Sequence, residues 1–134
     1  MKRLAVVFLA ALSTHALADS ATDGDWVFMF HTKWEHGASD WYFDKSTVSR
    51  SGDTIAYWER TNILSDTDPH RATTISHNLV NCATQQWTTT ALATSYSTEL
   101  PSVGDIHQVQ QEWQTSGPGA PATKAMIYLC KSIH

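Results

Sequence analysis

Cysteine is scarce in this sequence, whose 134 residues contain only Cys82 and Cys130. Neither cysteine belongs to a C-x-x-C motif, which excludes a thioredoxin-like redox pair. A zinc site would need further ligands at suitable spacing, and the two cysteines offer no such pattern. The chain also lacks the H-E-x-x-H and G-x-S-x-G signatures of zinc proteases and serine hydrolases. The role of the two cysteines therefore depends on the compartment in which the protein folds.

Positive charge and long apolar runs are scarce as well. Lysine and arginine number 9 against 13 acidic residues, and the formal net charge is −4. An acidic chain with scattered basic residues gains no counterion-release affinity for nucleic acid, so nucleic-acid binding is excluded. No apolar run beyond the N-terminus approaches the roughly 20 residues of a transmembrane helix, so no transmembrane segment is predicted.

The N-terminus has the pattern of a signal peptide. Lys2 and Arg3 precede an apolar run from Leu4 to Leu12, and Ala16-Leu17-Ala18 forms an A-x-A cleavage site. We predict a signal peptide over residues 1–18 and a single domain over residues 19–134. An even number of cysteines in an exported protein indicates a disulfide, so we predict a Cys82–Cys130 bond.

The hydrophobic pattern of the predicted domain favours strands followed by one helix. Dense or alternating apolar residues predict strands at 26–30, 41–43, 54–61, 71–82 and 86–96, the last two forming a hairpin. Apolar residues at helical spacing predict a C-terminal helix over residues 122–133, with Pro121 at its start. We predict an α+β fold: an antiparallel sheet of five or six strands, with a C-terminal helix tied to the sheet by the disulfide.

Four segments follow one another in the order "DWVFMF", "WYFDKSTVSRSGDTIAYW", "LVNCATQQW" and "EWQTSGPGAPATKAMIYLC". This order resembles the surface-adhesin protein E-like family of small bacterial envelope proteins. The resemblance covers nearly the whole predicted domain and implies an antiparallel sheet, a C-terminal helix and one disulfide. The protein after which the family is named is a surface lipoprotein that binds host extracellular-matrix and serum proteins and can dimerise. The present chain departs from it, because no lipid-attachment cysteine follows the predicted cleavage site.

Few side chains suggest catalysis or metal binding. Six histidines fall in the predicted domain, and their spacings match no zinc pattern. We therefore predict no catalytic residue, no metal and no cofactor. Six tryptophans are many for 116 residues, and those in or beside predicted strands, Trp26, Trp58, Trp87 and Trp113, should fill a small core.

Three residues are candidates for contact with a partner. Trp34 stands among polar residues in a predicted turn, where it either anchors a partner or folds back on the sheet. His70 and Arg71 follow Pro69 at the end of the longest predicted loop.

These observations favour an exported binding protein, periplasmic or secreted, that is not an enzyme. Its partner would be a host extracellular protein, an envelope component or a second copy of itself in a homodimer. Two alternatives stay open at this point. One is a periplasmic enzyme or metal-binding protein that uses histidines and acids, and the other is a structural part of an envelope assembly that pairs through a free sheet edge.

Overall fold

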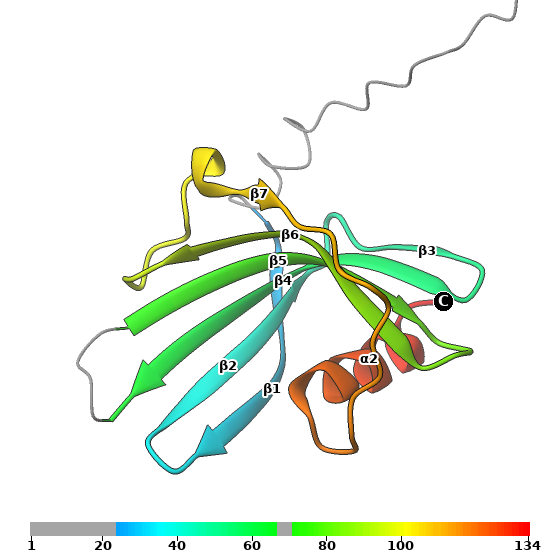
Figure 1. Ribbon diagram of the computed structural model, residues 1–134, viewed down its shortest axis with the longest axis horizontal. Helices are drawn as coiled ribbons and strands as arrows, with labels where there is room; N and C mark the ends of the chain where they lie inside the picture. The colour runs from blue at the N-terminus through cyan, green and yellow to red at the C-terminus, as the bar shows by residue number, and fades with distance from the viewer. Residues whose placement is uncertain (1–23, 67–70) are drawn as a thin grey trace, which may run out of the picture.

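A computed structural model of the protein describes residues 24–66 and 71–134. The described residues form a seven-stranded antiparallel sheet with the strand order β1-β2-β4-β5-β6-β7, and β3 pairs with β4 (Figure 1). A short 3₁₀ helix, η1, precedes β7, and the α-helix α2 follows it. The elements are β1 Trp26–Trp34, β2 Gly37–Asp44, β3 Ser49–Ser51, β4 Thr54–Ser65, β5 Arg71–Asn81, β6 Gln86–Ser95, η1 Val103–Asp105, β7 His107–Gln108 and α2 Pro121–Ser132.

The predicted architecture is confirmed, although several strands are longer than predicted. β4 continues through Ile63 and Leu64 to Ser65, a stretch that the sequence pattern assigned to a polar loop. β1 likewise continues to Trp34, so this tryptophan ends a strand and does not lie in a turn. In both places, pairing with neighbouring strands supplies backbone hydrogen bonds that local sequence preferences do not reveal.

Side chains alternate between the two faces of the sheet, and each face has its own apolar cluster. On the face that α2 covers, Ala125, Met126 and Leu129 of the helix pack with Tyr57 and Val80 of the sheet. The opposite face holds a second cluster formed by Trp58, Ile75, Ala91 and Ala93, against which Trp26, Leu100 and Ile106 pack. Trp113, predicted as a core residue, is instead 43% exposed. Its segment lies along the edge of the sheet and pairs with β6 only at the bridge between Gln114 and Trp87.

The C-terminal end of α2 is fixed to the sheet by two links. Cys82, just after β5, forms the predicted disulfide with Cys130 of the helix. Arg50 of β3 donates a hydrogen bond of 2.6 Å to the carbonyl oxygen of Ile133. Figure 1 accordingly shows the C-terminus lying beside β3. The helix is therefore held at its last turn, where an unanchored terminal helix would fray first.

Removing the disulfide should cost much of the net stability. The bond closes a loop with a sequence separation of 48 residues. In the chain-entropy account, a loop of this length contributes about 4 kcal/mol. We expect the Cys82→Ser/Cys130→Ser variant to lose roughly that amount of unfolding free energy, measured by urea unfolding. The reduced wild-type protein should match this variant, and a loss below about 1 kcal/mol would contradict the stabilising role.

Asp44 organises the turn between β2 and β3. The residue is fully buried, and its Oδ1 accepts hydrogen bonds from the backbone N–H groups of Asp25 and Ser46, each at 2.9 Å. The hydroxyl groups of Ser46 and Thr47 donate to the two carboxylate oxygens at 2.6 and 2.7 Å. The carboxylate thus connects the start of β1 to the turn that follows β2, and it has a structural role.

Replacing this carboxylate should destabilise the fold. Asp44→Ala removes a buried carboxylate that accepts four hydrogen bonds, so we expect a loss of about 3 kcal/mol of unfolding free energy, measured in urea. Asp105→Ala removes an exposed carboxylate and serves as the control. Equal stability of the two variants would show that the hydrogen bonds to Asp44 do not stabilise the fold.

Candidate functional site

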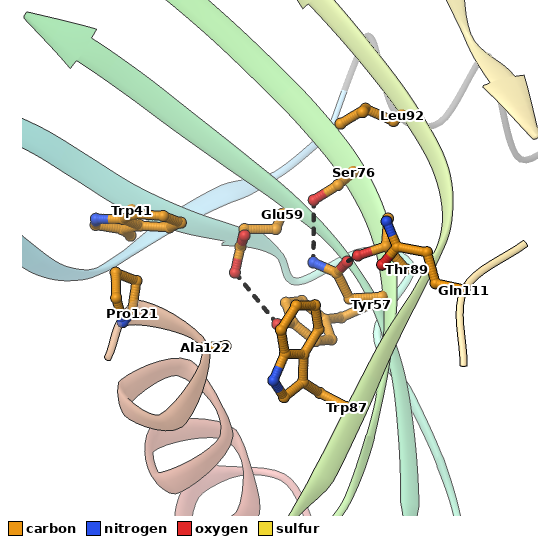
Figure 2. Close-up of a pocket in the computed structure, with 11 residues that line it drawn as sticks. Trp41, Tyr57, Glu59, Ser76, Trp87, Thr89, Leu92, Gln111, Pro121 and Ala122 are labelled. Carbon is orange, nitrogen blue, oxygen red and sulfur yellow. Dashed lines mark hydrogen bonds between the residues drawn. The ribbon is translucent and has the colours of Figure 1, made fainter. Parts of the chain in front are cut away.

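A cavity of about 340 Å³ opens on the helix-covered face of the sheet, beside the first residues of α2. Figure 2 shows Glu59 of β4 extending into it between Trp41 and Trp87, above Pro121 and Ala122. Its lining comes from four strands, the start of α2 and the segment before the helix. The lining residues are Trp41, Tyr57, Glu59, Ser76, Asn78, Trp87, Thr89, Leu92, Gln111, Pro121 and Ala122.

Glu59 is the acidic group of this cavity, and it is 8% exposed. The hydroxyl of Tyr57 donates a 3.2 Å hydrogen bond to its Oε2. Burial in an apolar site disfavours the charged carboxylate and raises the pKa of Glu59 to about 7, although hydrogen bonds from Tyr57 and Asn78 oppose the shift. Burial and the neighbouring carboxyl raise the pKa of Tyr57 as well, so its phenol stays neutral at physiological pH.

Polar side chains of β5 and β6 hold one another in place at the floor of the cavity. Asn78 donates to the hydroxyl of Ser76 at 3.0 Å, and its Oδ1 accepts from the hydroxyl of Thr89 at 2.7 Å (Figure 2). Strand pairing places these residues near Tyr57 and Glu59, because Asn78 lies opposite Tyr57 and Ser76 opposite Glu59. The floor is therefore a fixed polar network, in which satisfied groups are well ordered.

A second candidate surface lies on the opposite face of the sheet. Phe28, Tyr42 and Arg60 are register partners on β1, β2 and β4, so they form a row across three strands. The Phe28 ring, 50% exposed, meets the edge of Tyr42 at a centroid distance of 5.6 Å. The guanidinium carbon of Arg60 lies 5.8 Å from the centroid of Tyr42. Tyr42 and Arg60 are half-buried beside the exposed Phe28, and aromatic and arginine side chains at a surface are typical of protein-binding sites. We call this surface the open face.

The open face continues to the end of the sheet that carries Arg71. A smaller hollow of about 200 Å³ there is lined by Asp40, Arg60, Asn62 and Arg71, together with Ser97 and Thr98. Arg60 donates a 2.9 Å hydrogen bond to Asn62. Arg71, predicted from the loop pattern, is exposed and pairs with Leu64 at this end.

The structure separates Trp34 from Arg71. Trp34 is 46% exposed, and its ring lies over Gly37, where a built Cβ would approach the indole to 2.5 Å. Alternation along the paired strands places Trp34 and Arg71 at the same end of the sheet but on opposite faces. His70 lies outside the described residues, as does the predicted signal peptide.

The histidines do not assemble a metal centre within the described ranges. In residues 24–66 and 71–134, no three His, Cys, Asp or Glu side chains gather closely enough to hold an ion. His31 pairs with Asp40 on the open face, with 2.5 Å between Nδ1 and Oδ1. Within the same ranges, no helix has the length and apolar character needed to cross a membrane.

The sequence model of surface-adhesin protein E matches residues 26–131 of this chain. The chain belongs to the surface-adhesin protein E family. No curated protein and no solved structure gave a significant match. The match spans every strand and nearly all of α2, so both candidate surfaces of this family member lie within the matched region.

Sequence reasoning missed the residues that define both surfaces of this adhesin E family member. Glu59 reads as one polar residue in an alternating strand. Phe28 reads as a core residue of an apolar run, yet it faces outward. The one available signal was alternation: Tyr57 and Glu59 share a face two residues apart, so a buried Tyr57 implied a buried Glu59.

The raised pKa of Glu59 predicts a pH-dependent stability. The folded protein keeps the proton up to about pH 7, whereas the unfolded chain releases it near the ordinary value of 4.5. The protonated Glu59 therefore makes its whole contribution to the unfolding free energy at low pH. That contribution, roughly 3 kcal/mol, is lost as the pH rises from about 4.5 to about 7. Glu59→Gln should lack this loss, as measured by urea unfolding at several pH values.

The difference in unfolding free energy between wild type and Glu59→Gln at each pH isolates the contribution of Glu59. Burial lowers the pKa of His77, which gives a slope of opposite sign that is present in both proteins and cancels in the difference. Glu99→Gln alters an exposed carboxylate and should follow the wild type. Parallel pH profiles of stability for wild type and Glu59→Gln would show that the pKa of Glu59 is not raised in the folded protein.

Proposed function

We propose that this adhesin E family member is an exported envelope protein that binds other proteins through its open face and has no catalytic role. The observation that carries the proposal is the register-aligned row of Phe28, Tyr42 and Arg60. Half of the Phe28 surface is exposed, although the apolar run around it would allow its burial. Tyrosine and arginine, both present in this row, are among the side chains that most often dominate binding energy.

Further features of the open face favour a protein partner. The row is built on paired strands, so its side chains are held in fixed positions and lose little entropy on binding. The adjoining hollow presents polar groups of both signs, Asp40 and Arg71 among them, which suits a polar rim around an aromatic centre. The family name supports adhesion, and host extracellular-matrix or serum proteins are accordingly the partners we propose.

Export is proposed on separate grounds. The first 18 residues have the charged start, apolar run and A-x-A site of a signal peptide. The Cys82–Cys130 bond requires an oxidising compartment in order to persist, which agrees with the periplasm or the cell exterior.

The test is binding of the purified, oxidised protein to a panel of purified extracellular-matrix and serum glycoproteins by surface plasmon resonance. We expect saturable binding to at least one of them, weakened about tenfold or more by Arg60→Ala and by Tyr42→Ala. Arg71→Ala should weaken the same interaction to a smaller degree, because Arg71 lies at the edge of the open face.

Two controls separate the open face from the rest of the molecule. Trp34→Ala changes an exposed tryptophan on the opposite face, and Glu59→Gln changes the cavity, so both should bind like the wild type. Full binding by the Tyr42 and Arg60 variants would refute the open face as the interface. If Trp34→Ala alone weakened binding, the contact surface would lie on the helix-covered face instead.

A further inference from the structure

The cavity beside α2 contains a buried acid without a counter-charge. Glu59 is 8% exposed, and the hydrogen bond from Tyr57 reaches only its Oε2. Among the described residues, the ion pairs involve His31 with Asp40 and His36 with Glu35, and none reaches Glu59. A buried carboxylate is costly unless a cation or several donors compensate its charge. Hydrogen bonds from Tyr57 and Asn78 stabilise the Glu59 carboxylate in part, but no cation among the described residues pairs with it.

The walls of the cavity offer aromatic faces. The indole N–H of Trp41 donates to Thr32 at 2.9 Å, and that of Trp87 donates to Ser116 at 2.8 Å. Because both N–H groups are engaged away from Glu59, the two tryptophans contribute ring surface to the cavity. Trp41 also stacks on Phe30 with an interplanar angle of 20°, which fixes the orientation of its ring. Indole faces attract cations and also pack against apolar groups.

The remaining lining is uncharged. Besides Glu59, Tyr57 is the one lining residue that titrates, and its phenol stays neutral at physiological pH. Lys124 of α2 does not line the cavity, and its amine lies 6.0 Å from the centroid of the Phe30 ring. The amide of Asn78 donates to Ser76 and also favours the Glu59 carboxylate, and its carbonyl oxygen accepts from Thr89, so Asn78 contributes no charge. The cavity therefore combines one acid, two aromatic faces and no fixed cation in its lining.

From this arrangement we propose that the cavity binds a small organic cation, an alkylammonium whose charged group pairs with Glu59 and whose apolar part lies between Trp41 and Trp87. The volume of about 340 Å³ is at the small end of the range for ligand pockets, which favours a compact ligand. The cation supplies the missing counter-charge, and the aromatic walls supply cation–π and apolar contact. This site lies on the face opposite the proposed protein-binding surface, and neither proposal depends on the other.

Ionisation of Glu59 should control the affinity. Burial raises its pKa to about 7, so much of the free protein carries a neutral acid at and below that pH. The bound ammonium favours the carboxylate, and binding therefore strengthens as the pH rises through this range. An alkylammonium, like a lysine side chain, stays charged up to about pH 10. Any change in affinity between about pH 5.5 and about pH 8.5 then reports on the protein.

The experiment titrates the oxidised protein with n-butylammonium, n-butanol and butyrate, following the indole N–H resonances by NMR. We expect n-butylammonium to shift the Trp41 and Trp87 signals saturably, with n-butanol weaker by about tenfold or more. Glu59→Gln should weaken n-butylammonium binding by a similar factor and abolish its pH dependence. Glu99→Gln, an exposed carboxylate, should leave both unchanged.

Several outcomes would overturn the proposal. Equal affinity for n-butanol and n-butylammonium would mean an apolar pocket without charge selection. Tightest binding of butyrate would mean an anion site at the start of α2. Unchanged binding by Glu59→Gln, or the absence of any saturable shift, would also refute it. If Glu59→Gln fails to fold, the wild-type pH profile decides, because affinity that does not rise with pH excludes pairing with Glu59.

Discussion

The structure depends on the packing of one short helix against a much longer sheet. α2 has 12 residues and β4 also has 12. A helix of that length spans about 18 Å, whereas a strand of the same length spans about 40 Å. One helix therefore cannot cover the face on which it lies. The disulfide and Arg50 fix the last turn of α2 near Cys82 and β3. The first turn of α2 therefore lies part-way along the sheet. The cavity lies beside that first turn.

The position of the cavity explains how a buried acid can persist in so small a domain. Where α2 covers β4, the helix-facing residues are apolar, as at Ile55. Further along the strand come Tyr57 and then Glu59, at the cavity. A carboxyl group beneath the helix itself would be sealed from solvent, but at the cavity it can take up a proton or a ligand. The cost of burying it is thus limited by its location, since a buried acid can neutralise itself.

The two faces of the sheet are suited to different kinds of contact. The helix-covered face encloses a small volume and fits a compact ligand. The opposite face is closed over β5 and β6 by the chain around Leu100 and Ile106, which leaves the row from Phe28 to Arg60 accessible. That row is flat and extended across three strands, a shape that suits a protein surface better than a small molecule. A single domain can therefore carry two independent sites.

The sequence by itself determined the class of the protein and its covalent frame. Strand alternation, the apolar spacing before Ile133 and two cysteines in a chain with a predicted signal peptide were sufficient to predict the sheet, the helix and the disulfide. Local patterns carry this information because side-chain periodicity follows directly from backbone geometry. Tertiary structure alone decided which side chains are buried and which meet. Glu59 became a buried acid, and Tyr42 and Arg60 became neighbours, through strand register, which pairs residues far apart in the chain. The ends of β1 and β4 were likewise set by pairing partners, and local preference could not have located them.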